Sequence, residues 1–225
     1  MSDETAYAML TDMLAALDMP KKASSRVRFI GAERLPSCFP VSELAAASIA
    51  AAATAVAELA GLFSAIPSVS LSYRSASLWF GWSIQPLGWE MPNPWDAIAG
   101  DYKALDGWIK LHTNAPHHRA AALSVLQCAP DRDSVADMVA TWRGDDLEAA
   151  IVEAGGCAAR LRSIGEWAKH PQGKAVAAEP LISWSMPANN VFGRWQPSPN
   201  RPLSGLGVLD LTRVLAGPVA PRFLA

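Results

Sequence analysis

The chain has 225 residues and a formal net charge of −2. Hydrophobic residues make up 51% of it and charged residues 18%, a composition that indicates a globular chain with a sizeable core and excludes intrinsic disorder. The near-neutral balance excludes a broad basic surface, so we expect no nucleic-acid partner.

Two helices are predicted in the first third of the chain. Apolar residues recur at helical spacing over residues 3–18, and Pro20 ends that run. A second helix is expected over the alanine-rich residues 44–63, with Ser42 as its N-cap. This segment is long enough to span a membrane. However, alanine contributes little transfer free energy and Glu58 is costly in lipid, so we expect a buried helix and no membrane association.

An alternating segment and an aromatic loop follow. Apolar residues alternate with serine or arginine within Ser68–Trp82, which predicts a strand. Tryptophans, prolines and glycines are concentrated from Trp79 to Trp95, and this pattern predicts an irregular but ordered loop. Its aromatic side chains either fill the core of a small module or form the wall of a ligand cleft.

The middle of the chain predicts a β-hairpin followed by short helices. Asp106-Gly107 is a hairpin turn signal within residues 101–114. Proline, acidic residues and capping boxes predict helix starts at Pro116, Ser134, Asp145 and Ser163. Together these elements predict a mixed α+β module.

The last part of the chain predicts the opening of a βα unit. Prolines and asparagines over residues 183–205 indicate a linker. Val208–Leu211 is then predicted as a strand, and a helix is expected to begin near Pro218 after a turn. A complete βαβ unit needs about 30 residues or more, so we expect the chain to stop inside this unit.

The reactive side chains do not have the spacing of a metal or catalytic site. His112, His117 and His118 lack the four-residue spacing of a helical metal pair, so cap or surface roles are expected and no metal. Cys157 follows a Gly-Gly pair, and Arg160 and Arg162 are near enough in sequence to activate a thiolate. No histidine accompanies this cysteine, so we expect a packed thiol.

Cysteine usage and the amino terminus indicate a compartment. Cys38, Cys128 and Cys157 lie far apart and form no CxxC pair, so neither a disulfide framework nor a zinc site is predicted. The first 20 residues carry acidic rather than basic side chains, unlike a signal peptide. We therefore expect a cytoplasmic protein.

One stretch of the chain resembles a known family. Residues 202–218, PLSGLGVLDLTRVLAGP, closely resemble the amino-terminal opening of family III CoA-transferases, the CaiB/BaiF family. A looser resemblance to that family's smaller domain covers residues 28–182. It rests on DGWIKLHTN (106–114), PHHR (116–119), GGCAA (155–159), Arg162-Ser163 and Glu166-Trp167.

The resemblance implies an enzyme that acts on acyl-CoA. Family members move CoA between carboxylic acids or racemise acyl-CoA thioesters, and a catalytic aspartate forms mixed anhydrides with the acyl group. They are interlocked homodimers that need no metal and no permanently bound cofactor, and coenzyme A thioesters are their substrates. In the family, the loop after the first strand lines the CoA and acyl site. It corresponds here to Arg213, Val214, Leu215, Ala216 and Gly217.

The resemblance also implies a division of the chain. Residues 1–185 are expected to form a small-domain-like α+β module, 186–202 a linker and 203–225 the start of the Rossmann-like large domain. The family's catalytic aspartate is expected beyond residue 225, so no catalytic residue is assigned and the chain alone is expected to lack transferase turnover. The alternatives are a non-catalytic dimerisation or acyl-CoA-binding module and a racemase-type family member.

Overall fold

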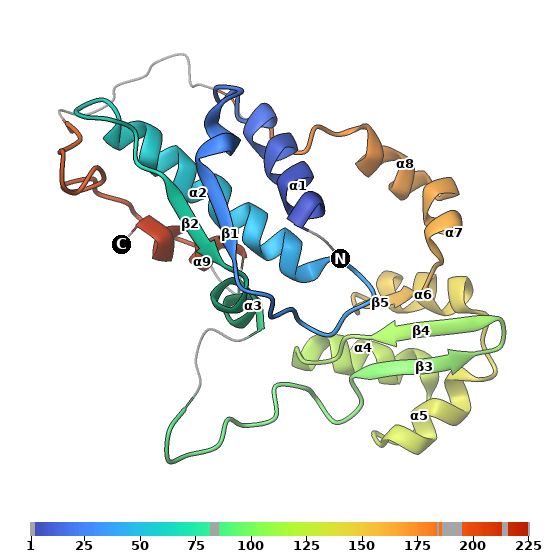
Figure 1. Ribbon diagram of the computed structural model, residues 1–225. Coiled ribbons are helices and arrows are strands. Elements are labelled where there is room, and N and C mark those ends of the chain that lie inside the picture. Colours follow the sequence, from blue (N-terminus) through green and yellow to red (C-terminus); the bar gives the residue numbers. More distant parts are fainter. Residues whose placement is uncertain (1–2, 82–85, 184, 186–194, 213–215, 225) are drawn as a thin grey trace. The chain divides into compact units, whose positions relative to one another are not determined.

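The computed structural model describes residues 3–81, 86–183, 185, 195–212 and 216–224, which divide into two compact units (Figure 1). Unit 1 comprises Met1–Gln85 and Pro180–Ala225, and unit 2 comprises Pro86–Glu179. About 48% of the chain is helix and 10% is strand, which confirms the predicted mixed α/β class. The predicted domain boundaries at residues 185 and 202 stay a prediction.

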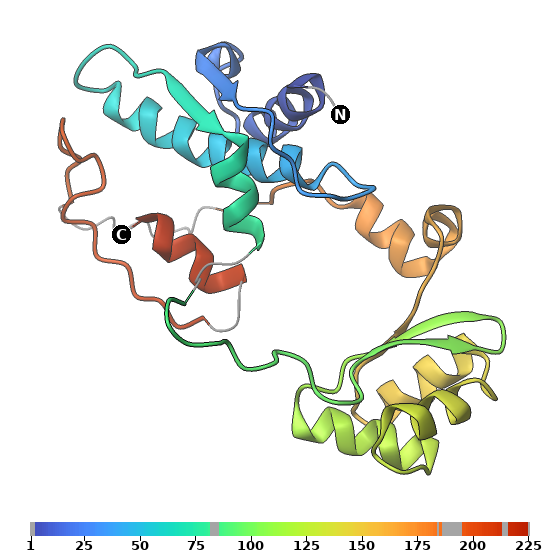
Figure 2. The same cartoon turned by 60° about the horizontal axis from the view of Figure 1, so that its bottom comes forward.

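Unit 1 is built around one pair of parallel strands and the helix that connects them (Figure 2). β1 (Val27–Ile30) pairs in parallel with β2 (Val69–Ser72), and α2 (Val41–Ala60) is the crossover between them. α1 (Asp3–Ala16) packs along α2. The carboxyl ends of both strands meet at one edge, where the chain leaves β2 and enters α3 (Tyr73–Gly81). In α/β folds this edge is where ligands bind.

Alanine gives α2 its close packing. The side chains of Ala45, Ala46, Ala47 and Ala50 are fully buried, and their small size lets neighbouring elements approach the helix axis. A short 3₁₀ turn, η1 (Ala23–Arg26), leads from α1 towards β1. Among the described residues, α2 is the one helix that is long and apolar enough to cross a membrane. Inside unit 1, 44% of its most apolar window is buried.

Two predictions for unit 1 are wrong in detail. α2 begins at Val41, so Ser42 lies in its first turn and is not the N-cap. The strand predicted over Ser68–Trp82 ends at Ser72, because β2 pairs with a partner of only four residues. The chain then forms α3, whose buried residues recur at helical spacing: Tyr73, Ala76 and Ser77.

The end of unit 1 confirms the predicted helix but not the predicted strand. Val208–Leu211 is irregular and has no strand partner among residues 195–212, and Leu209 and Leu211 are more than four-fifths exposed. A strand without a partner leaves its backbone groups unpaired, so this sequence pattern alone does not form one. The helix expected near Pro218 is α9 (Ala216–Leu224), and the Arg222 guanidinium lies 3.8 Å from the ring centroid of Trp79 in α3.

Unit 2 is an antiparallel sheet covered on one face by helices. Its strand order is β3 (Gly100–Ala104), β4 (Gly107–Leu111) and β5 (Ala158–Arg160). The predicted hairpin at Asp106-Gly107 joins β3 to β4 and is confirmed. The helices are α4 (Pro116–Leu126), α5 (Arg132–Val139), α6 (Gly144–Glu153), α7 (Ile164–Lys169) and α8 (Pro171–Ala178).

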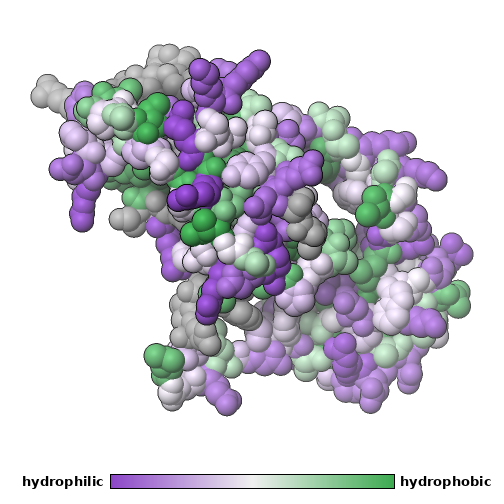
Figure 3. Space-filling model, viewed as in Figure 1, coloured by the Kyte–Doolittle hydropathy of each residue, from purple (hydrophilic) through white to green (hydrophobic). Residues whose placement is uncertain are grey.

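The inner face of the sheet and α4 to α6 enclose an aliphatic core, whereas the outer face is polar. Ile109, Leu126 and Leu147 are fully buried in this core. The opposite faces of β3 and β4 carry Asp101 and Lys110, which form an ion pair, and Figure 3 shows hydrophilic residues mixed with less polar ones in this part of the molecule. The alternation of buried and exposed residues along these strands is that of a sheet with one solvated face.

The helix caps of unit 2 confirm one prediction and correct another. Ser163 and Glu166 form the predicted capping box at the start of α7. The box predicted at Ser134–Asp137 is wrong, because α5 already begins at Arg132. Its cap is Asp131, whose carboxylate accepts a hydrogen bond from the Ser134 backbone N–H.

Candidate functional site

The loop predicted to contact CoA is only partly described. Arg213, Val214 and Leu215 lie outside the described residues, whereas Ala216 and Gly217 open α9. Gly217 packs so closely against Thr212 that a Cβ atom at this position would collide with the Thr212 side chain. Its small size is therefore required locally by packing, and the predicted contact with CoA stays a prediction.

The three histidines lie close together in unit 2 but are not placed as metal ligands. The ring centroids of His117 and His118 are 4.2 Å apart, and those of His112 and His118 are 6.4 Å apart. Among the described residues, no group of three or more histidine, cysteine or acidic side chains is placed to hold a metal ion.

Two further sequence interpretations need correction. Cys157 is exposed and not packed, and the two arginines near it in sequence are engaged by carboxylates. Trp89 and Trp95 are more than half exposed, so neither fills a core, and Trp95 instead lines a cavity of about 460 Å³ in unit 2. Trp82 lies outside the described residues.

A carboxylate that the sequence reading missed lies in the core of unit 1. Glu43 is in the first turn of α2 and is 0% exposed, and it is the one charged side chain that is buried among the described residues. It lies on α2 close after the loop that leaves the carboxyl end of β1. Burial of a charged group is costly unless the group is paired and hydrogen-bonded, so Glu43 needs a partner inside the core.

Arg34 provides that pairing. Its Nε donates to Glu43 Oε1 at 3.0 Å, and its side chain is itself only 19% exposed. The guanidinium carbon lies 3.1 Å from the ring centroid of Tyr73, the first residue of α3. A weaker contact of 3.4 Å joins Arg34 Nη2 to Asp3 at the start of α1. Side chains from three other segments of unit 1, Asp3, Glu43 and Tyr73, therefore surround the Arg34 guanidinium.

We call Arg34, Glu43 and Tyr73 the carboxylate centre. Glu43 Oε2 is buried without a hydrogen-bond partner, and the Asp3 carboxylate lies beside the buried Tyr73 hydroxyl. Burial, followed by the nearby Asp3 carboxylate, raises the pKa of Tyr73 above its usual range, so the phenol keeps its proton at neutral pH. The unpaired carboxylate oxygen is unusual, because buried polar atoms are almost always paired.

The loop from Gly31 to Pro40 covers the carboxylate centre. Most of its residues are exposed. Besides the contacts of Arg34, the Leu35 backbone N–H donates to Ser42 Oγ at 2.8 Å, and the Pro40 carbonyl accepts from the Leu44 backbone N–H at 3.0 Å. That hydroxyl also shares a 2.8 Å hydrogen bond with Ser77. Gly31 has a φ of +85°, a conformation that favours glycine. Few contacts therefore hold this loop in place.

The sequence did contain a signal for this centre. Within the alanine-rich helix, Glu43 is the one acidic residue before Glu58, and it directly follows the residue assigned as the N-cap. A first-turn acidic residue ordinarily stabilises the helix dipole while exposed, so the pattern by itself predicts a surface glutamate. Only the tertiary packing of Arg34 and Tyr73, which are distant in sequence, shows that the residue is buried.

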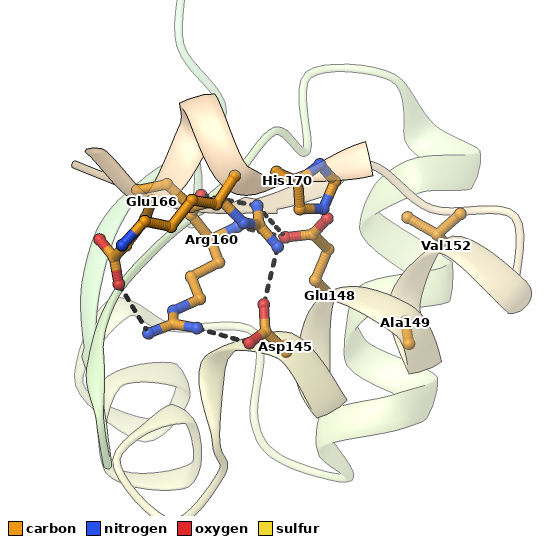
Figure 4. Close-up of a pocket in the computed structure, with 9 residues that line it drawn as sticks. Asp145, Glu148, Ala149, Val152, Arg160, Glu166 and His170 are labelled. Atoms are coloured by element: carbon orange, nitrogen blue, oxygen red, sulfur yellow. Dashed lines mark hydrogen bonds and ion pairs between the residues drawn. The ribbon is translucent and has the colours of Figure 1, made fainter. Parts of the chain in front are cut away.

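Unit 2 carries a charged cavity of about 660 Å³ whose arginines are already neutralised (Figure 4). Arg162 contacts Asp145 at 2.7 Å and Glu148 at 3.0 Å, and Arg160 contacts Asp145 at 2.5 Å and Glu166 at 3.6 Å. Three carboxylates therefore face two guanidinium groups. The remaining cation of the lining, Lys169, makes the charge balance zero rather than positive. This cavity does not have the excess positive charge that a phosphate site needs.

The network around the cavity also fixes local structure. The Ser163 backbone N–H, which donates to Glu166 at 2.8 Å, is the main reason that the pKa of Glu166 lies below its usual value. Glu148 accepts from the Arg160 backbone N–H at 2.6 Å, which ties α6 to β5. These contacts connect α6, β5 and α7 and stabilise the packing of these elements.

Comparisons with known proteins give one relative by sequence. No protein-family model matches the chain. An acyl-CoA transferase from Gibberella moniliformis is 26% identical to it over 141 residues, which are 55% of this chain and 24% of the fungal protein. The chain thus spans about a quarter of the length of the curated relative that it matches. It is a distant homologue of a fungal acyl-CoA transferase.

Comparisons of structure give a weaker likeness. A crystal structure of Rv3272 from Mycobacterium tuberculosis in an orthorhombic form has a TM-score of 0.46 and 13% identity, covering 79% of this chain and 56% of the solved chain. A mutant of the same protein has a TM-score of 0.45 and 12% identity, covering 75% and 49%. We draw no functional argument from likenesses at this level.

Proposed function

We propose that this chain is part of an acyl-CoA transferase of family III, acting on an acyl-CoA and a carboxylic acid. The observation that carries the proposal is the similarity to the fungal acyl-CoA transferase over 141 residues. The resemblance of residues 202–218 to the opening of that family supports it from a second part of the chain.

The proposal assigns the acyl-accepting carboxylate of this chain to Glu43. CoA transfer through an anhydride requires a carboxylate nucleophile that is shielded from water, because water would hydrolyse the intermediate. Glu43 is buried, lies in the first turn of the helix that follows β1 and keeps Oε2 free of hydrogen bonds. The expectation that the family's catalytic aspartate lies beyond residue 225 stays a prediction.

The chemistry divides into balanced steps. Glu43 Oε2 attacks the thioester carbonyl carbon, the carbon–sulfur bond breaks, and CoA leaves as a thiolate while an acyl–glutamyl anhydride forms. The thiolate then attacks the glutamyl carbonyl carbon, which releases the first acid as a carboxylate and leaves a glutamyl-CoA thioester. A second carboxylic acid reverses both steps and leaves as the new acyl-CoA.

Access to Glu43 requires the loop from Gly31 to Pro40 to move. The carboxylate is fully buried beneath this loop, and Arg34 is the main side chain that holds the loop in place. Loops held by few contacts open at small cost, and closure after substrate entry excludes water from the reaction. Arg34 remains available as a cation beside the carboxylate in the closed state.

The remaining features of the proposal concern partners and setting. Arg213, Val214, Leu215, Ala216 and Gly217 are proposed to contact CoA, as in the family that residues 202–218 resemble. We further propose a cytoplasmic homodimer without a metal or permanently bound cofactor, and without nucleic-acid or membrane partners. Sustained turnover is not expected from this chain alone, because it corresponds to about a quarter of its relative's length.

One observation favours a second candidate function. Val208, Leu209 and Leu211 are exposed apolar side chains in one short segment of unit 1. Exposed apolar patches mark association surfaces, so the chain would serve as a dimerisation or acyl-CoA-binding module without chemistry of its own. A racemase-type reaction would use the same acyl-CoA ligand.

Chemical trapping tests the proposed function. The chain is incubated with acetyl-CoA and then with hydroxylamine, which converts a glutamyl anhydride or thioester into a hydroxamate that peptide mass spectrometry locates. We expect a hydroxamate on Glu43, because the first half-reaction needs only the carboxylate and the thioester.

Matched variants make the trapping specific. Glu43→Gln should abolish the hydroxamate, whereas Glu58→Gln, which changes the other glutamate of the same helix, should retain it. The absence of any hydroxamate on Glu43 in the unmodified chain would refute the assignment and leave the non-catalytic module as the better account. Persistence of the signal in Glu43→Gln would show that another carboxylate reacts.

A further inference from the structure

A second cavity of unit 2 combines an exposed aromatic ring with cationic side chains. Its volume of about 460 Å³ is within the range of small-molecule sites, and it lies at the open end of the β3–β4 hairpin, where Gly100 pairs with Leu111. The proposed function makes no use of this cavity. Its lining includes one aromatic side chain, two cations and two other polar side chains: Trp95, Lys110, Arg132, Asn93 and Asp96.

Arg132 is held in the cavity without a carboxylate partner. Its Nη1 donates to the Ala99 carbonyl at 3.1 Å, and its guanidinium carbon lies 5.1 Å from the ring centroid of Tyr102. A Cβ atom at Gly100 would lie 2.7 Å from Arg132 Nη2, so glycine leaves the space that the guanidinium occupies. Asp131, its neighbour in sequence, is engaged in the cap of α5. In the parts of the chain that the structure describes, Nε and Nη2 of Arg132 therefore remain free to donate to an anion.

The carboxylates around the cavity are engaged with other groups. Asp96 accepts from the Thr113 hydroxyl at 2.8 Å and lies 3.6 Å from the Arg119 guanidinium. Asp101 pairs with Lys110 at 2.9 Å on the outer face of the sheet. The lining thus differs from that of the 660 Å³ cavity, whose carboxylates compensate its cations. Here one guanidinium keeps its positive charge available for a ligand.

Hydrogen bonds hold Trp95 in place beside this cation. Asn114 accepts from the Asp96 backbone N–H at 3.0 Å and donates to the Pro94 carbonyl at 2.7 Å, which fixes the backbone on both sides of Trp95. The Trp95 backbone N–H donates to the Asn93 side chain at 3.0 Å. The residue is nevertheless more than half exposed. An aromatic ring that is already ordered and still faces water can stack on a flat ligand at small entropic cost.

We propose that this cavity is a binding site for a flat aromatic ring that carries an anionic group, a phosphate or a carboxylate. The ring would stack on Trp95, and the Nε–Nη2 edge of Arg132 would donate two hydrogen bonds to two oxygens of the anion. This is the geometry in which guanidinium groups recognise carboxylates and phosphates. The inference stands apart from the proposed function, because it uses no residue of unit 1.

Calorimetric titration of the whole chain tests the site. Adenosine 5′-monophosphate and 2-naphthoate are the probes, because each joins a flat ring to one anionic group. Adenosine and 2-naphthamide keep the ring without the anion, whereas ribose 5-phosphate and acetate keep the anion without the ring. We expect at least one probe to bind about 10-fold more tightly than both of its own controls. The probe that binds more tightly identifies the anion as a phosphate or a carboxylate.

Matched variants assign the binding to the cavity. Arg132→Ala should weaken binding of the tighter probe by about 10- to 100-fold, as on loss of a charge-assisted pair, and Trp95→Leu by about 10-fold. Arg132→Lys keeps the charge but not the paired donors, so its affinity should be intermediate. Arg143→Ala and Trp108→Leu are the controls, because both residues are more than half exposed and neither lines the cavity. Both should bind the probe as the wild type does.

Two results would overturn the inference. One is the absence of saturable binding of either probe at millimolar concentration. The other is an unchanged affinity in Arg132→Ala, which would show that the probe binds elsewhere on the chain.

A measurement on the unmodified chain covers the case in which a variant does not fold. Saturation with the tighter probe should shift the backbone amide resonances of Gly100 and Leu111, which line the cavity, and leave those of Gly155 and Gly165 in place. Shifts confined to residues outside the lining would contradict the proposed site.

Discussion

The two units bury different kinds of side chain. The core of unit 2 is aliphatic, with Leu126, Leu147 and Ile151 fully buried, and its charged groups meet at the surface in the network around Arg160 and Arg162. The core of unit 1 is rich in alanine and includes a glutamate with no exposed surface. Of the five buried polar residues in the described parts of the chain, four belong to unit 1: Ser42, Glu43, Thr54 and Ser77.

This difference indicates where the chemistry lies. A buried charge lowers stability unless it is well paired, and such groups persist mainly where a function needs them. In unit 2 the charges compensate one another at an open surface, where ion pairs contribute little. In unit 1 one carboxylate is dry, has a single cationic partner and keeps one oxygen unpaired. The polar core of unit 1 is therefore the part of the chain to which we assign the proposed reaction.

The largest expected effect comes from the cation of the buried pair. Arg34→Ala leaves Glu43 buried without its partner, which should lower the free energy of unfolding by about 3–5 kcal/mol. Lys110→Ala in unit 2 breaks a pair of which both sides are about half exposed, and should cost about 0.5 kcal/mol. Urea unfolding of both variants measures the contrast. Similar losses would erase the distinction between the units.

A cavity in unit 2 should affect stability without affecting reactivity. Leu147 is fully buried in the aliphatic core, so Leu147→Ala should lower the free energy of unfolding by about 3 kcal/mol. Hydroxamate formation on Glu43 should remain at its wild-type level under native conditions, because the carboxylate centre belongs to the other unit. A parallel loss of reactivity in a still-folded variant would show that the two units act as one.

The smallest expected effect is a pH dependence of unit 2. Hydrogen bonds from backbone N–H groups lower the pKa of Glu166, through Ser163, and of Asp106, through Gly144. A carboxyl whose folded-state pKa is depressed stabilises the fold above its unfolded-state pKa, and this stability is lost as pH falls through the folded-state value. Thermal stability should therefore decline below about pH 4.5.

Ser163→Ala, which removes the cap hydroxyl, should lower the melting temperature by a few degrees at pH 7 and by less at pH 3. An equal drop at both pH values would contradict the linkage.

Local patterns predicted the elements of the chain better than their contacts. The hairpin at Asp106-Gly107 and the Ser163–Glu166 capping box follow from residues within a few positions of each other, and both are present. The strand at Val208–Leu211 failed because a strand depends on a partner that a local pattern does not specify. The strand predicted over Ser68–Trp82 was wrong beyond Ser72, where the chain forms α3, for the same reason.

The carboxylate centre could not be predicted in this way. Arg34, Glu43 and Tyr73 meet only because the parallel pair brings the ends of β1 and β2 to one edge. Nothing in the spacing of these residues indicates a contact, since Glu43 reads as an ordinary first-turn acidic residue and Tyr73 as part of an alternating strand. Their relation is a property of the fold and not of any segment.

Peptide mapping of the carboxylates after acetyl-CoA and hydroxylamine treatment tests the central claim most directly. The account predicts a hydroxamate on the peptide that contains Glu43 and none on the peptides that contain Asp145, Glu148 and Glu166. Modification confined to the exposed acidic residues of unit 2, or no modification of Glu43, would contradict it.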